Sequence, residues 1–274
     1  LTRPELAVLL AYSKLRLYNQ LLASDVPEDP YFSAELDRYF PEPVRRRFGK
    51  AIGRHRLRRE IIATATTNSL VNRMGPTFVQ RAEAETAATP AQIARAYTIA
   101  REAFGMREHW AAIEALDNRV PAATQYSMMA ALARLLRHSS HWLLRQRDRS
   151  LAVDARVRQL RPAIDQLLGR WSQSLGAEER ERILRERDAL VTAGVPQSLA
   201  GIVACADTLA AAFDIVELAA ATRLRPHDVA EGWHELGQRL GLDWLGRRID
   251  ALSVEGPWQA AARRDLRDSA QQLH

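Results

Sequence analysis

The chain has 274 residues, of which 47% are hydrophobic, so it can bury a sizeable core and is not a disordered protein. Its single cysteine, Cys205, excludes an internal disulfide framework and a cysteine-rich metal site, and it fits a reducing, cytoplasmic setting. The formal net charge is +6, and most of that charge comes from one short segment.

The first predicted element is an amphipathic helix. Thr2-Arg3-Pro4-Glu5 reads as a capping box with proline in the first turn. A Pro- and Asp-rich loop over residues 24–30 should end this helix, and a short aromatic helix should follow over residues 31–40. The chain opens on Leu1 and not on methionine, from which we expect a piece of a longer polypeptide.

A long basic helix is predicted next, from about Pro43 to Met74, with an interruption near Gly49 and Gly53. Residues 45–59 hold seven arginines, one lysine and no acid, a charge of +8, so the rest of the chain sums to −2. Three interpretations are open: a solvated helix face, an intersubunit or interdomain surface that pairs with carboxylates, and a nucleic-acid site. We favour the second. The nucleic-acid site is least favoured, because such sites usually interleave aromatic residues with the basic ones and here only Phe48 is aromatic.

Uncharged polar residues also recur along this helix. Glu60, Thr64, Asn68 and Asn72 follow one another at four-residue steps, which sweep slowly round a helix. They could form an exposed face. Because threonine and asparagine are mediocre helix formers, we instead expect a buried polar network that specifies one packing partner.

Helical patterns continue through the rest of the chain. Thr89-Pro90-Ala91-Gln92 is a second capping box, and a long helix should follow Pro121. No alternating strand pattern and no fixed-period repeat is found. The predicted fold class is all-α, a multi-helix array or bundle. We expect two packed helical lobes, residues 1–148 and 149–274, with a single domain as the alternative.

The most apolar segment runs from Ser198 to Thr222. It is long enough to span a bilayer, but Asp207, Asp214 and Glu217 make that costly, so we expect one buried helix and no membrane association. Their spacing would place the three carboxylates near one face. They could form an acidic pocket, but pairing with Arg223, Arg225 or another helix is favoured.

Histidine and cysteine patterns do not reach a catalytic or metal site. His138 and His141 are three residues apart, and Glu231 to His234 is a single Glu-x-x-His, whereas a di-metal bundle needs two such motifs and two further carboxylates. Structural histidines are therefore expected. Cys205 is expected to be a small core residue and not a nucleophile.

Several segments occur in an order that is specific to one family. The chain resembles the C-terminal region of the large bacterial NAD-specific glutamate dehydrogenases. The segments that carry this resemblance are LTRPELAVLLAYSK, SDVPEDPYF, YFPEPVRRRF, HRLRREIIATATTNSLVNRMGPTFV, ALDNRV and DIVELA. The resemblance covers essentially the whole chain and is strongest over residues 1–120.

The resemblance implies a helical tail of an enzyme that deaminates L-glutamate to 2-oxoglutarate with NAD, and whose catalytic domain lies upstream. It implies homo-oligomeric parents, so the expected partners are that domain and other subunits. The residues agree with a non-catalytic part, since no Gly-x-Gly is present and neither lysine, Lys14 or Lys50, matches the catalytic motif.

We therefore expect no catalytic, cofactor or metal residues in this chain, with NAD bound in the parent's catalytic domain. The alternative is a free-standing helical module that binds protein or nucleic acid, although nucleic acid is not favoured. The residues expected at an interface are Arg45, Arg46, Arg47, Arg54, His55, Arg58, Arg59, Glu60, Thr64, Asn68, Asn72 and Arg73.

Overall fold

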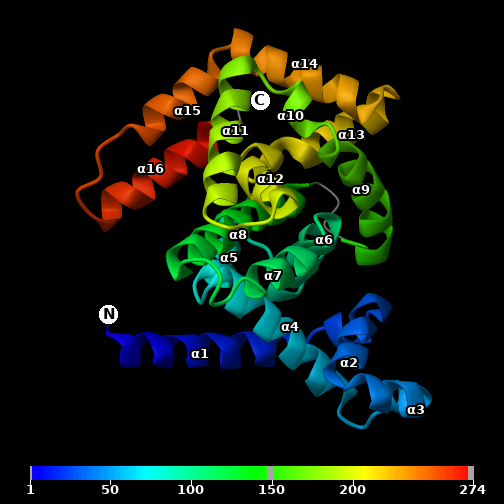
Figure 1. The fold of residues 1–274 in the computed structure, drawn as a ribbon. Coiled ribbons are helices and arrows are strands. Elements are labelled where there is room, and N and C mark those ends of the chain that lie inside the picture. Colours follow the sequence, from blue (N-terminus) through cyan, green and yellow to red (C-terminus); the bar gives the residue numbers. More distant parts are fainter. Residues whose placement is uncertain (1, 147–150, 271–274) are drawn as a thin grey trace. The chain divides into compact units, whose positions relative to one another are not determined.

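The computed structural model describes residues 2–146 and 151–270. Within these ranges the chain forms sixteen α-helices and three short 3₁₀ helices, and no strand (Figure 1). The predicted all-α class is therefore confirmed. Helical periodicity was the dominant pattern in the sequence, and the helices follow it.

The chain divides into two compact units, residues 1–162 and 163–274. The lobe boundary predicted after residue 148 falls on residues 147–150, which lie outside the described part, and it stays a prediction. The first unit contains α1 to α8 and most of α9. The bounds of these nine helices are Arg3–Leu22, Ser33–Tyr39, Glu42–Ile52, Arg58–Met74, Phe78–Thr86, Pro90–Ala103, Met106–Glu114, Ala122–Arg145 and Val153–Leu168.

Helix α6 forms the centre of the first unit. Nine of its fourteen residues are buried, and it packs against α8, α5, α7 and α1. Both predicted capping boxes are present: Thr2 caps α1 and Thr89 caps α6, each with its reciprocal side-chain bond. The basic helix is interrupted as predicted, since α3 ends at Ile52 and α4 begins at Arg58.

The second unit contains α10 to α16. Their bounds are Trp171–Ser174, Ala177–Thr192, Gln197–Cys205, Ala212–Thr222, Pro226–Arg239, Leu242–Asp250 and Pro257–Ala270. Trp171 is buried at the centre of this unit. Its indole Nε1 donates a 2.8 Å hydrogen bond to Thr208 Oγ1, and its ring meets that of His234 edge to face.

The expectation of a single helix from Ser198 to Thr222 is wrong. The segment breaks after Cys205, continues as a 3₁₀ turn over Thr208–Ala211 and resumes as α13, with a bend of 65° between its two arms. Asp207 lies at the break, so it does not share a helix with the other two carboxylates. Its partner is Arg267 of α16 at 3.9 Å, which confirms pairing with another helix.

A helix that crosses a bilayer must be both long and apolar. None of the described helices is by itself long and apolar enough to cross a bilayer, and only the bent pair Gln197–Cys205 and Thr208–Thr222 reaches the required length and composition.

Candidate interaction surface

The basic segment lies on α3 and on the turn that leads into α4. Five cations are exposed here and have no ion-pair partner in the described part of the chain: Arg45, Arg47, Lys50, Arg54 and Arg56. Arg46 differs, because it pairs with Glu42 one turn earlier. We call these five residues the basic surface. Uncompensated like charges repel one another, so a partner that carries carboxylates would lower the free energy of this surface.

The last two arginines of the segment, Arg58 and Arg59, face the protein instead. Arg59 Nη2 donates to the carbonyl oxygens of Leu22 at 2.6 Å and Ser24 at 3.4 Å, and the same guanidinium pairs with Glu28. Arg58 Nη2 donates to the Pro27 carbonyl at 3.3 Å. Carbonyls at a helix C-terminus lack partners within their helix, so these arginines hold the end of α1 on α4.

Two further predicted interface residues are also used internally. Arg73 Nη2 lies 2.6 Å from Glu114 Oε1, and its guanidinium stacks over the ring of Trp110, which joins α4 to α7. His55 Nδ1 accepts a hydrogen bond from the Leu57 amide. The structure therefore gives these residues, like Arg58 and Arg59, a packing role within the first unit.

The expected buried network along Glu60, Thr64, Asn68 and Asn72 is not found. Thr64 and Asn72 are exposed, the other two are half-buried, and none of the four side chains hydrogen-bonds within the described part of the chain. These four residues lie toward the outer side of α4, whereas Ile62, Thr66 and Leu70 face the core.

A polar network does reach the core, but it involves Ser69 of α4 and not the four residues named above. The Ser69 and Tyr97 hydroxyls are 3.0 Å apart, and Arg101 Nη1 donates to Ser69 Oγ at 3.3 Å. Arg101 also pairs with Glu35 at 2.8 Å and with Glu102 at 2.6 Å. The sequence signal that could have revealed it is one arginine on the otherwise apolar and alanine-rich face of α6.

The charges of this network stabilise one another. Burial opposes ionisation of Glu102, but Arg101 and Arg107 outweigh it and hold the pKa of this carboxyl below its ordinary value. Burial likewise opposes the charge of Arg101, yet the carboxylates of Glu35 and Glu102 keep its pKa above the ordinary value. The network is thus a satisfied structural element that holds α6 against α2.

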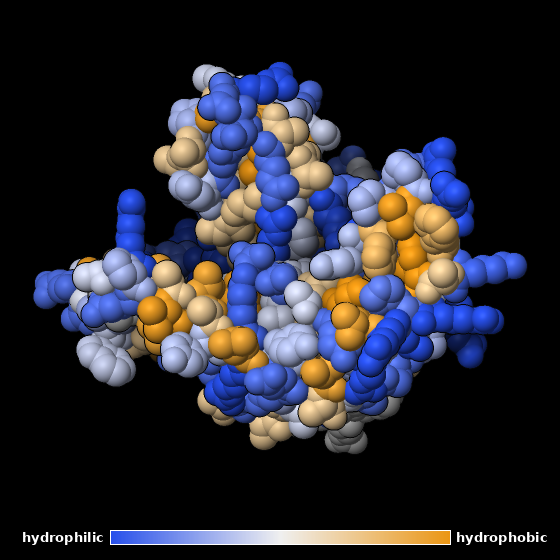
Figure 2. Space-filling model, turned by 90° about the horizontal axis from the view of Figure 1, so that it is seen from below, coloured by the Kyte–Doolittle hydropathy of each residue, from blue (hydrophilic) through white to orange (hydrophobic). Residues whose placement is uncertain are grey.

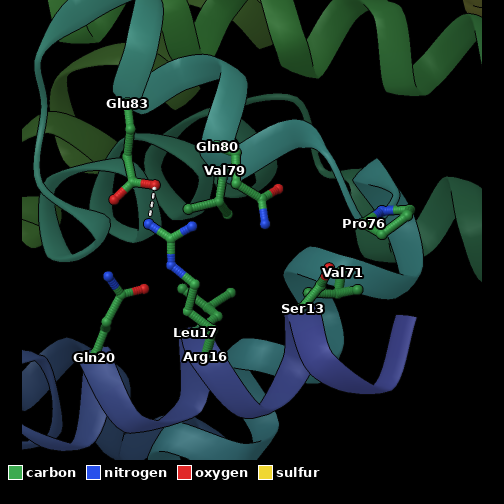
Figure 3. Close-up of a pocket in the computed structure, with 9 residues that line it drawn as sticks. All are labelled: Ser13, Arg16, Leu17, Gln20, Val71, Pro76, Val79, Gln80 and Glu83. Atoms are coloured by element: carbon green, nitrogen blue, oxygen red, sulfur yellow. Dashed lines mark hydrogen bonds and ion pairs between the residues drawn. The ribbon is translucent and has the colours of Figure 1, made fainter. Parts of the chain in front are cut away.

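A small cavity lies where α1 meets α4 and α5 (Figure 3). The ion pair of Arg16 and Glu83, 3.1 Å apart, crosses it, and the buried Oε1 atoms of Gln20 and Gln80 line it without a hydrogen-bond partner in the described residues. Its volume of about 10 Å³ suits one water molecule and no substrate or cofactor.

The histidines and the cysteine have structural surroundings. His141 Nδ1 lies 3.2 Å from Glu85, and Glu231 contacts His227 in place of His234. Within the described residues no group of three or more His, Cys, Asp or Glu side chains is placed to hold a metal ion. Burial raises the pKa of Cys205 to about 11, so its thiol is protonated at neutral pH and is a poor nucleophile.

Comparison with known proteins gives a consistent result. The family described as "Glutamate dehydrogenase, C-terminal" matches residues 1–274. NAD-specific glutamate dehydrogenase of Halomonas elongata is 44% identical over 98% of this chain and 17% of its own length. The proteins of the same name from Pseudomonas aeruginosa and Mycobacterium tuberculosis are 39% and 32% identical, again over 98% of this chain and 16% of their own length. The chain thus spans about a sixth of these relatives.

Proposed function

We propose a function that starts from the family to which the chain belongs, the glutamate dehydrogenase C-terminal family. The chain is the non-catalytic helical domain of a longer NAD-specific glutamate dehydrogenase. The observation that carries this proposal is the match to almost the whole chain by relatives of which the chain is only 16–17%. The parent enzyme converts L-glutamate, NAD⁺ and water into 2-oxoglutarate, ammonium, NADH and a proton. We assign it to the cytoplasm and expect it to assemble from several copies.

The residues of this chain support a role outside the chemistry. NAD-binding folds hold the pyrophosphate between a strand, a glycine-rich turn and a helix. The sequence has no Gly-x-Gly, and the described residues form no strand that could precede one. These features support our proposal that NAD and glutamate bind in the part of the parent that lies outside these residues.

The role that we propose for the chain is packing against that catalytic part, with the basic surface as one contact. Arg45, Arg47, Lys50, Arg54 and Arg56 are exposed cations without a carboxylate in the described chain. Arginine pairs well with carboxylates at interfaces because its planar fork can bind both oxygens. A carboxylate-bearing face of the catalytic part is the partner that this surface fits. The nucleic-acid alternative has no support from the comparisons.

An activity assay tests the proposal. The longer polypeptide should reduce NAD⁺ in the presence of L-glutamate, and residues 1–274 alone should not. Reduction of NAD⁺ by residues 1–274 alone would contradict the non-catalytic role. An inactive longer polypeptide would contradict the assignment of the parent.

The packing role is tested by charge reversal in the longer polypeptide. Limited proteolysis should release the C-terminal region faster from an Arg45→Glu/Arg47→Glu/Lys50→Glu variant than from the unchanged protein, because the contact is weakened. The matched control is Arg158→Glu/Arg185→Glu/Arg239→Glu, which reverses three exposed arginines that lie on other helices and have local partners. Equal rates of release from both variants would count against the basic surface as a contact.

A further inference from the structure

Helix α1 is apolar on both sides. Leu17 and Leu21 are buried against the rest of the first unit, whereas Val8, Tyr12 and Leu15 face away and are 53%, 69% and 57% exposed. Figure 2 views the molecule from below and shows hydrophobic residues exposed among hydrophilic ones on that surface. Large apolar side chains that gather on an exposed surface mark an interaction site, so a second partner fits the outer side of α1.

An open groove runs beside this apolar side, between α1 and α4. Its volume is about 260 Å³, and six residues line it: Lys14, Leu15, Tyr18, Thr64, Thr67 and Asn68. Two of them, Thr64 and Asn68, belong to the polar series on α4. The groove therefore combines a wall from α1 that holds two large hydrophobic side chains and one lysine with a polar, uncharged wall from α4.

Two features of the lining indicate what the groove binds. Thr67 is 2% exposed, yet its hydroxyl has no hydrogen-bond partner in the described residues, and a buried unpaired hydroxyl destabilises the fold. Lys14 is the one charged residue of the lining and forms no ion pair in the described part. The lining thus leaves one hydroxyl unpaired, and the groove calls for a carboxylate near Lys14.

We propose that this groove binds an amphipathic α-helix of the longer polypeptide, from outside residues 1–274, with a carboxylate beside its apolar ridge. A third helix in the groove between two helices is a common recognition mode, with apolar anchors three and four residues apart. The relatives are about six times as long as this chain, so the same polypeptide supplies ample sequence for such a helix. The inference rests on the proposed function and names one place where the C-terminal domain binds the rest of the enzyme.

Photo-crosslinking in the longer polypeptide tests the proposal. The photoreactive p-benzoylphenylalanine replaces Tyr18 in one variant and Leu15 in a second, and crosslinked peptides are mapped by mass spectrometry after irradiation. We expect both probes to crosslink to a single helical segment of the same polypeptide outside residues 1–274. Combining the Tyr18 probe with Leu15→Asp and Lys14→Glu should abolish that product, because the apolar and the charged contact are both lost.

The control is the same probe at Tyr126, which is 73% exposed on α8 and should give no such product. Crosslinks from Tyr18 and Leu15 to a second copy of residues 1–274 would replace the proposed occupant with a self-association contact. Yields no higher than at Tyr126 would show that the groove is unoccupied, and either result overturns the proposal. Glutamate-dependent NAD⁺ reduction by the same preparations shows whether the proposed function stands independently of the groove.

Discussion

Helices α1 and α6 begin in the same way and end in different surroundings. Each starts with a threonine cap, a proline in the first turn and a reciprocal bond from the third residue, Glu5 in α1 and Gln92 in α6. Yet α6 buries nine of its fourteen residues, and α1 buries two of its twenty. Capping fixes where a helix starts, whereas burial depends on what the remainder of the fold brings to it.

The exposed residues of α1 are not those of a solvated helix. A helix that faces water usually carries charged side chains on its outer side, and α1 carries valine, leucine and tyrosine there. The first unit therefore buries most of α6, whereas it leaves most of α1 uncovered. Substitutions in α6 should destabilise this chain, and substitutions in α1 should matter mainly in the longer polypeptide.

The largest effect is expected at Arg101. Replacing it with methionine leaves the buried carboxylate of Glu35 and the half-buried one of Glu102 without their main partner, which should lower the free energy of unfolding by about 3–5 kcal/mol in urea denaturation. Arg16→Met on α1 removes an exposed pair with Glu83 and should cost no more than about 1 kcal/mol. Equal costs for the two variants would remove the distinction between the helices.

Acid should destabilise the α6 region through Glu102. The pKa of this carboxyl is lowered in the folded state, so its stabilising contribution is present above the ordinary pKa of 4.5 and is lost as the pH falls through the folded pKa. The urea midpoint of Glu102→Gln should therefore fall less than that of the unchanged chain between pH 7 and pH 3.

Glu5 on α1 provides the contrast to Glu102. Hydrogen bonds from the backbone amide and hydroxyl of Thr2 also lower the pKa of Glu5. Those bonds protect only the exposed first turn of α1, so Glu5→Gln should leave the pH dependence of the urea midpoint unchanged. A midpoint that changes with pH in the same way in the Glu102→Gln chain and in the unchanged chain would be inconsistent with the assigned role of Glu102.

The smallest effects are expected at the two caps. Thr89→Ala should lower the global free energy of unfolding by about 1 kcal/mol, because α6 unfolds only with its unit. Thr2→Ala should fray the exposed start of α1 and leave the global value nearly unchanged, so hydrogen exchange and not denaturation should detect it. If Thr2→Ala lowered the global free energy of unfolding as much as Thr89→Ala, α1 would unfold only together with the rest of its unit, contrary to this account.

Local signals in the sequence were sufficient for most of the fold. Both capping boxes, the break near Gly53 and the helix after Pro121 lie where they were predicted. The segment from Ser198 to Thr222 was misjudged, because its apolar residues continue through the break and carry no proline or glycine there to mark it. The resemblance to the dehydrogenase family is confirmed by the comparisons.

The surface was harder to predict than the fold. Residues in the same charge run diverge: Arg45 and Arg54 are exposed, whereas Arg59 caps α1 across thirty-seven residues of sequence. Composition cannot distinguish these cases, because the difference lies in which carbonyls the tertiary structure brings near. The polar series on α4 stands out in the sequence, but its neighbours do not: the half-buried Ser69 contributes to the network, and the buried Thr67 lines the groove.

Hydrogen exchange of α1 in two contexts tests the central claim most directly. In residues 1–274 alone, the amides over the first half of α1 should exchange fast and those of α6 slowly, because only α6 is covered. In the longer polypeptide, α1 should become protected while α6 stays as it was. Equal exchange of α1 in both contexts would contradict the claim that this domain docks through α1 and its groove.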